Sequence, residues 1–144
     1  MRDDLETKNI KNCIFHGFCN DTNYIFDHID LLCMPSRFEG LPMAALESMR
    51  AGKPVLASNI GGLPELIHHG DNGFLAGKHN INCFKKSLQQ WISMSQQDKK
   101  TMACNAHKTI EDNYNAEVEI NKILTLYEQK IKKDQSNACP SISL

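Results

Sequence analysis

The sequence contains no run of eighteen apolar residues, which argues against a transmembrane helix. It also lacks an excess of basic charge, because 16 lysines and arginines stand against 17 acidic residues for a net charge of −1. A nucleic-acid partner is therefore not expected. The first six residues have no apolar core, so they do not resemble a secretory signal. With 41% hydrophobic and 23% charged residues over 144 positions, the composition is that of one globular domain.

No two cysteines are spaced as zinc ligands or as a C-x-x-C redox motif. The six cysteines are Cys13, Cys19, Cys33, Cys83, Cys104 and Cys139. Free thiols in a cytoplasmic protein are the simplest interpretation. Cys33 lies inside an apolar run and is predicted to be a small buried hydrophobe.

Short apolar runs separated by glycines and by helical segments dominate the first half of the chain. Strands are predicted at 12–17, 30–35, 54–58 and 73–76, and helices at 21–29, 41–51 and 64–68. Asp21 or Thr22 is the expected cap of the first helix, with Tyr24, Ile25 and Ile29 as its apolar stripe. Unbroken apolar strands that alternate with helices indicate an α/β fold with a parallel, Rossmann-like sheet covered by helices on both faces.

The second half is helical in character. Helices are predicted at 80–94, 96–113 and 115–132, and residues 134–144 are predicted to form a flexible tail after a domain at 1–133. Three lysine pairs, at 85–86, 99–100 and 132–133, are interpreted as solvated faces. Peripheral contact with a membrane surface is the alternative for these lysines.

Residues 35–66 carry the functional signal. A loop from Ser36 to Leu41 joins a buried strand to a helix that begins near Pro42. Ligands of open parallel sheets bind at such loops, and the first N–H groups of a helix favour phosphate. Pro42 has no N–H, so the donors are expected on Gly40, Leu41, Met43 and Ala44.

Two carboxylates flank this helix start. Glu39 lies in the loop and Glu47 lies inside the helix. A carboxylate accepts two hydrogen bonds at once, so either residue suits the vicinal hydroxyls of a ribose or hexose. Glu111 and Glu119 have the same spacing in plain helix, where we expect two exposed surface residues far from Glu39.

The setting of Glu39 and Glu47 resembles the donor-binding domain of the retaining GT-B glycosyltransferases of family 4. The likeness covers roughly residues 10 to 130, with Phe15-His16-Gly17 and Asp30-Leu31-Leu32 in the family's order. The segments that carry it are Pro35-Ser36-x-x-Glu39-Gly40-Leu41-Pro42, Glu47, Gly52-Lys53-Pro54-Val55 and Gly61-Gly62-x-Pro64-Glu65.

The resemblance implies a transferase that uses a nucleotide-sugar donor and a saccharide or lipid-linked acceptor, with retention. It makes Glu39 the catalytic residue beside the transferred sugar, and it makes Glu47 the ligand of the nucleotide ribose. The family members are usually metal-independent, so no metal or other cofactor is expected. The implied donor site consists of Ser36, Glu39, Gly40, Leu41, Pro42, Met43 and Glu47.

Several alternatives remain open on the sequence. Ser36 either caps a turn or contacts ligand, and Arg37 is either an exposed loop residue or a phosphate ligand. A glycoside hydrolase also needs two carboxylates, although it needs no phosphate site at a helix start. A non-catalytic nucleotide-sugar-binding fragment or interaction module is the stronger rival.

The resemblance also implies missing parts. We expect the family's N-terminal domain, and the first two strands of the donor domain with its sheet order 3-2-1-4-5-6, to be missing from these residues. The predicted strand at 12–17 would be the third and that at 30–35 the fourth. We therefore expect the segment at 12–17 to stand apart or to pair non-natively, and one flank of the strand at 30–35 to be open. The isolated polypeptide is expected to bind nucleotide-sugars weakly, to transfer no sugar and to aggregate.

Overall fold

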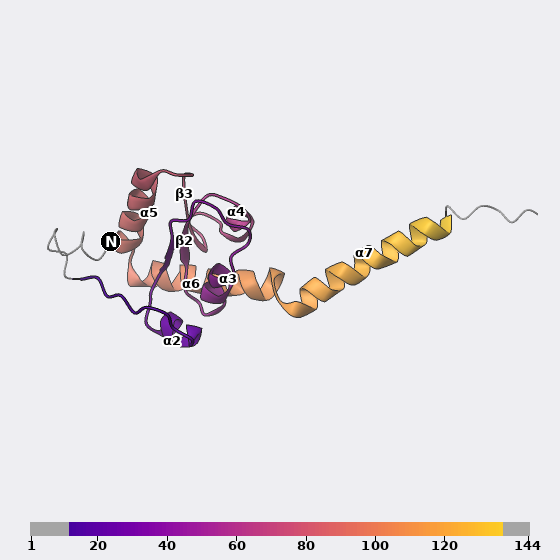
Figure 1. The fold of residues 1–144 in the computed structure, drawn as a ribbon, viewed down its shortest axis with the longest axis horizontal. Coiled ribbons are helices and arrows are strands. Elements are labelled where there is room, and N and C mark those ends of the chain that lie inside the picture. The colour runs from indigo at the N-terminus through magenta and orange to yellow at the C-terminus, as the bar shows by residue number, and fades with distance from the viewer. Residues whose placement is uncertain (1–11, 137–144) are drawn as a thin grey trace, which may run out of the picture.

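The computed structural model describes residues 12–136. At its centre lies a parallel sheet with strand order β1-β2-β3 (Figure 1). The strands are β1 (Leu32–Met34), β2 (Val55–Ser58) and β3 (Gly73–Ala76). Each lies within the range predicted for it, and both pairings are parallel. The predicted α/β fold class is confirmed.

Six helices accompany the sheet in the described part of the chain. They are α2 (Thr22–Asp27), α3 (Met43–Arg50), α4 (Leu63–Leu66), α5 (Ile81–Ser93), α6 (Gln96–Asn113) and α7 (Ala116–Ser136). Asp21 caps α2, since its side chain accepts hydrogen bonds from the N–H groups of Asn23 and Tyr24. Gly52 lies just past α3 with a φ of 69°, a left-handed conformation that glycine adopts without a Cβ penalty.

The helices cover both faces of the sheet and form two cores. All four residues of β2 are buried. Val55 and Ala57 point into one core, with residues of α3, α4 and α6. Leu56 points into the other core, beside Phe74 of β3 and Trp91 of α5. The alternation along β2 is the two-residue period expected of a strand between two helical layers.

The prediction of a buried strand at residues 12–17 is wrong. All six residues are exposed and have no regular secondary structure, and the side chain of Ile14 is 80% exposed. A short strand is stable only when it is paired in a sheet, and none of the described strands pairs with this segment. The segment therefore stands apart from the sheet, as expected from the strand order.

The outer flank of β1 is open within residues 12–136, because β2 is its only strand neighbour there. Cys33, predicted to be buried, is exposed on this edge strand. Leu32 and Met34 are half-buried. The atoms around the Cys33 thiol still desolvate it, which raises its pKa. The prediction for Cys33 failed because the sheet ends at β1 on this side.

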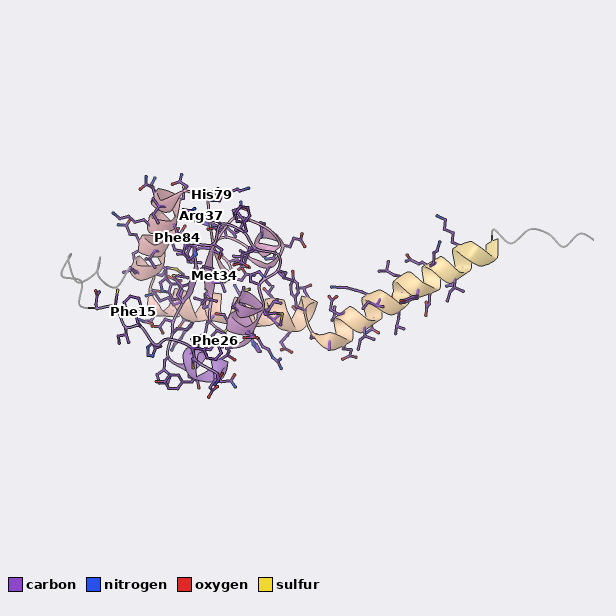
Figure 2. All side chains as sticks on the ribbon, in the orientation of Figure 1. Phe15, Phe26, Met34, Arg37, His79 and Phe84 are labelled. Atoms are coloured by element: carbon purple, nitrogen blue, oxygen red, sulfur yellow. The ribbon has the colours of Figure 1, made fainter. Side chains whose placement is uncertain are left out.

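The apolar stripe expected on α2 is also wrong. Phe26 is the buried residue of this helix, whereas Tyr24 and Ile25 are 49% and 36% exposed. With less than two turns of helix, the direction of the buried face was set by one aromatic side chain. Phe26 is 6% exposed and lies between α2 and the body of the molecule (Figure 2).

Helix α7 extends away from the rest of the molecule (Figure 1). It runs through Ser136, past the predicted helix end at 132, and the remainder of the predicted tail, 137–144, lies outside the described residues. Its apolar residues Ile120, Ile123, Leu124, Tyr127 and Ile131 are at least half exposed. Among the described residues, no helix combines the length and the hydropathy needed to span a bilayer.

Candidate functional site

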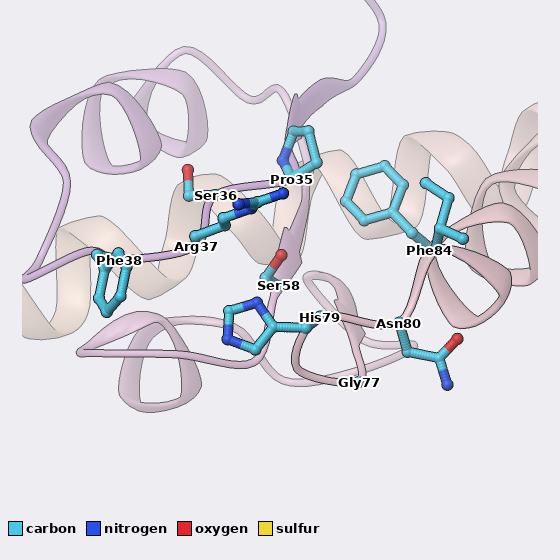
Figure 3. A pocket seen from close by; sticks show the side chains of 10 residues that line it. Pro35, Ser36, Arg37, Phe38, Ser58, Gly77, His79, Asn80 and Phe84 are labelled. Carbon is cyan, nitrogen blue, oxygen red and sulfur yellow. The ribbon is translucent and has the colours of Figure 1, made fainter.

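The three strands end at one edge of the sheet, and a hollow opens there. Pro35 follows β1, Ser58 ends β2 and Gly77 follows β3, so residues distant in sequence meet at this edge (Figures 2 and 3). We call this the first hollow; its volume is about 540 Å³. Its lining residues are Pro35, Ser36, Arg37, Phe38, Ser58, Gly77, His79, Asn80, Ile81 and Phe84. The carboxyl edge of a parallel sheet is where its ligands bind.

A second hollow of about 410 Å³ lies beside the first and contains Glu39. Arg37 and Phe38 line both hollows and so form the wall between them. The other residues of the second hollow are Gly40, Ile60, Gly61 and Lys78. Glu39 itself is half-buried. The structure thus brings the proposed catalytic carboxylate together with two basic side chains.

The Gly61–Gly62 pair holds the loop that carries Glu39. The Gly62 N–H donates a 2.7 Å hydrogen bond to the Gly40 carbonyl oxygen. Gly61 has a φ of 55°, and a Cβ there would lie 2.0 Å from the carbonyl oxygen of Glu39. A Cβ on Gly62 would lie 3.3 Å from that of Leu41. Two glycines are needed because the backbone of one segment rests directly on the backbone of the other.

Helix α3 begins next to this loop. Pro42 is its N-cap residue rather than part of its first turn, and no side chain caps the helix. Leu41 and Met43 are 43% and 64% exposed. An uncapped helix start has backbone N–H groups available and a partial positive charge, both of which favour an anion. Gly40, Leu41 and Pro42 lie immediately before this helix, and Met43 is its first residue.

Glu47 lies apart from Glu39. It is half-buried on α3 and lines a third hollow of about 550 Å³ with Thr22, Asn23, Phe26, Arg50 and Ala51. Glu39 thus precedes α3, Glu47 lies in the middle of it, and the two residues line different hollows. Of the seven predicted site residues, Ser36 lines the first hollow, Glu39 and Gly40 line the second, and Glu47 lines the third.

The second pair of glutamates lies on the surface, as expected. Glu111 and Glu119 are both exposed, and Glu119 forms a 2.7 Å ion pair with Lys122 one turn along α7. Neither residue lines the hollows described above. Equal spacing in sequence therefore does not distinguish a site from a helix surface.

Replacing Glu111 by alanine should change the free energy of unfolding by less than about 0.5 kcal/mol, the usual range for an exposed side chain without a specific partner. Urea denaturation followed by circular dichroism measures the change. A loss of more than about 1 kcal/mol would show that the Glu111 carboxylate has a structural role that its exposure does not indicate.

The adjacent histidines His68 and His69 follow α4. The ring of His69 packs edge-on against Phe74 at 5.5 Å, and its Nδ1 accepts a hydrogen bond from the Leu75 N–H. In the part of the chain that the structure describes, no three histidine, cysteine or carboxylate side chains are grouped as metal ligands.

The family model for glycosyl transferases group 1 matches residues 3–109. The chain belongs to this family. Among curated relatives of this group 1 chain, an uncharacterized glycosyltransferase of Haemophilus influenzae is 36% identical over 75 residues, 51% of this chain and 21% of the relative. The UDP-Gal:alpha-D-GlcNAc-diphosphoundecaprenol alpha-1,3-galactosyltransferase of Escherichia coli is 31% identical over 119 residues, 81% of this chain and 30% of the relative. The chain thus spans about a fifth to a third of these proteins.

Comparison with solved structures agrees with this family membership. The C-terminal domain of the group 1 protein LpcC from Francisella tularensis matches with a TM-score of 0.69 and 26% identity, over 80% of this chain and 60% of that one. Anabaena HepE, solved with UDP and glucose, matches with a TM-score of 0.72 and 26% identity, over 94% of this chain and 35% of that one. Staphylococcus aureus TarM, solved with UDP, matches with a TM-score of 0.77 and 25% identity, over 88% of this chain and 26% of that one. The fold is that of a GT-B C-terminal domain.

Among the lining residues of the first two hollows that were not predicted from the sequence, three are polar residues of the segment after β3. Lys78 lines the second hollow, and His79 and Asn80 line the first. All three follow β3. The sequence signal that could have located them is Gly77, a glycine directly after a parallel strand, followed by the helix cap Asn80. His79 has a φ of 54°, which is uncommon for a residue with a Cβ.

Proposed function

We propose that this chain supplies part of the donor site of a retaining GT-B glycosyltransferase of family 4. The whole enzyme would move a hexose or related sugar from a nucleotide-sugar to an acceptor in the synthesis of a glycan, a lipid-linked saccharide or a polysaccharide. The chain spans only part of its relatives, so we propose that an N-terminal domain completes the enzyme. The remaining donor strands would come from outside residues 1–133.

One observation carries this proposal: the close contact of Gly61–Gly62 with the Glu39–Gly40 loop at the uncapped start of α3. The contact supports the proposal because it holds the loop that carries Glu39 directly before the uncapped start of α3, at the carboxyl edge of the sheet. A nucleotide-sugar needs both the carboxylate and the helix start, because its sugar offers hydroxyls and its diphosphate offers negative charge.

Each predicted residue has a role in this proposal. Glu39 would bond the sugar hydroxyls and stabilise the positive charge that develops at the anomeric carbon. The N–H groups of Gly40, Leu41 and Met43 would face the diphosphate beside Pro42 at the start of α3. Ser36 would contact the donor from the first hollow. Glu47 would hold the ribose hydroxyls from its position further along α3.

Calorimetric titration of the chain with UDP and UDP-glucose tests the donor site. The solved structures of HepE and TarM contain UDP, which makes it the first nucleotide to try. Replacing Glu47 by alanine should lower nucleotide affinity about tenfold or more, because hydrogen bonds to a charged group contribute about 1.5–3 kcal/mol. The E111A variant is the matched control and should bind as the unchanged chain does. Equal affinities for all three proteins would refute the ribose role of Glu47.

Replacing Glu39 by glutamine should lower turnover much more than nucleotide affinity. In this proposal the Glu39 carboxylate contacts the sugar and the positive charge that develops at its anomeric carbon. Its removal should therefore mainly reduce transition-state stabilisation. Steady-state kinetics of a complete enzyme built around this segment separates the two effects. If E39Q and E47A lose nucleotide affinity equally while E39Q retains normal turnover, the two roles are assigned wrongly.

A non-catalytic nucleotide-sugar-binding fragment or interaction module is the second candidate function. The share of the relatives' length that this chain covers favours it, and we propose that these 144 residues alone transfer no sugar. Nucleotide binding without transfer in the completed enzyme would support that candidate. We propose that the whole enzyme transfers sugar without a metal. We also propose that it works in the cytoplasm, either free or at the inner face of the membrane, where the free thiols of the described cysteines remain reduced.

A further inference from the structure

The first hollow has a positive lining. Its ten residues include Arg37 and His79 and contain no aspartate or glutamate. Figure 3 shows the Arg37 guanidinium and the His79 ring on either side of the Ser58 hydroxyl. A guanidinium has five N–H donors, and a hydroxyl and an imidazole can each donate one more. This set of groups suits an anion with several acceptor oxygens.

The start of α5 adds to the positive field. Asn80 caps this 13-residue helix through its side-chain oxygen, which accepts from the N–H groups of Asn82 and Cys83. Asn80, Ile81 and Phe84 line the hollow, so the amino end of the helix lies at its wall. This end has a partial positive charge. His79, immediately before the cap, is held at a φ of 54°, and such conformations persist where the surrounding structure fixes them, often at ligand sites.

The wall between the two hollows relates this anion to the donor. Arg37 and Phe38 line both hollows, and Glu39 lies on the far side of that wall. Phe38 is 88% exposed, so its ring is available to an apolar sugar face. A ligand with its phosphate in the first hollow and its sugar over Phe38 would direct a hydroxyl group toward Glu39.

We propose that the first hollow is an anion subsite for a phosphate-bearing saccharide acceptor, held by Arg37, His79 and Ser58 beside the start of α5. The assignment to the acceptor rests on the proposed function, because it takes the second hollow as the donor site. The phosphate belongs either to a sugar phosphate or to a lipid-linked saccharide, and both sources present anionic phosphate oxygens to the hollow.

Titration of the full chain with glucose 1-phosphate, followed by the amide chemical shifts of residues 35–38 and 77–84, tests this subsite. Methyl glucoside, which has no phosphate, should bind at least tenfold more weakly. Replacing Arg37 by glutamine should weaken binding of glucose 1-phosphate about ten- to a hundredfold, because a charge-assisted bond is lost. H79Q should have a smaller effect in the same direction. Lys86→Gln removes one positive charge from the exposed face of α5 outside the hollow and should leave binding within twofold.

Repeating the titration with saturating UDP distinguishes an acceptor subsite from part of the donor site. Binding of glucose 1-phosphate that persists with UDP present supports the proposal, whereas competition by UDP would overturn it. Equal losses in R37Q and K86Q would also overturn it, because they would indicate a general charge effect. If only the proposed function is wrong, the result differs: UDP does not bind, but R37Q still binds glucose 1-phosphate more weakly than the unchanged chain and K86Q do. A lipid-linked saccharide phosphate in detergent that binds when glucose 1-phosphate does not would assign the subsite to the lipid-linked source.

Discussion

Replacing Gly61 by alanine should destabilise the chain by roughly 2–4 kcal/mol and abolish measurable nucleotide binding. The new Cβ would lie 2.0 Å from the Glu39 carbonyl oxygen and 2.7 Å from that of Gly40. Both obstacles are backbone atoms, so relief requires the Glu39–Leu41 loop to move. That movement would break the hydrogen bond from the Gly62 N–H to Gly40. The left-handed conformation at Gly61 adds its own cost for alanine.

Gly70→Ala is the matched control. Gly70 has a φ of 84°, also left-handed, but a Cβ there would meet nothing within 4 Å. It should therefore cost only the conformational penalty, about 1–2 kcal/mol, and leave nucleotide binding intact. Urea denaturation and calorimetric titration with UDP measure the two effects. If G61A and G70A behave alike in both assays, the loop does not depend on the close approach of Gly61.

Replacing Asn72 by alanine should lower the free energy of unfolding by about 2–4 kcal/mol. Asn72 is fully buried, and both the oxygen and the nitrogen of its side-chain amide form hydrogen bonds. Its oxygen accepts from the His68 N–H at 2.7 Å. Its nitrogen donates to the Leu66 carbonyl at 3.1 Å and to the Thr109 hydroxyl at 2.9 Å. Alanine would leave several polar groups without partners in the interior, where each costs about 1–3 kcal/mol.

Asn105→Ala provides the comparison, since it removes the same chemical group from a half-exposed position. The Asn105 side chain donates to the Asp71 carboxylate at 2.7 Å, but water can replace that bond. Its loss should cost less than about 1 kcal/mol. Thermal unfolding of both variants checks the order. A smaller loss for N72A than for N105A would mean that the Asn72 network contributes little net stability.

The sequence was sufficient to predict the strands that are buried on both faces. The run at 73–76 is apolar throughout, and that at 54–58 is apolar up to its last residue, Ser58; β2 and β3 lie within one residue of the predicted limits. A strand buried in this way needs no information from distant residues. The segment at 12–17 has the same apolar character, yet it forms no strand, because pairing depends on a partner and not on composition.

The site was predictable where it follows from one continuous segment. The loop at 36–41 and the start of α3 lie at the carboxyl edge as expected. Lys78 and His79 could not be placed in the same way, because they reach that edge only through the parallel pairing of β3 with β2. The separation of Glu39 and Glu47 into two hollows likewise depends on where α2 lies against α3.

Helix α6 links the two sides of the sheet. Its Met102 packs in the core with Leu56 and Trp91, while Ala106 and Ile110, further along the helix, pack in the core with Val55 and Met49. Unfolding of either core would therefore also remove the contacts that hold α6 against the other core. Backbone amides of β2 should exchange with solvent deuterium only through opening of the whole domain, and those of the protruding α7 through local opening. The sheet and the helices on its two faces would then open as one cooperative unit, and α7 would open separately from it.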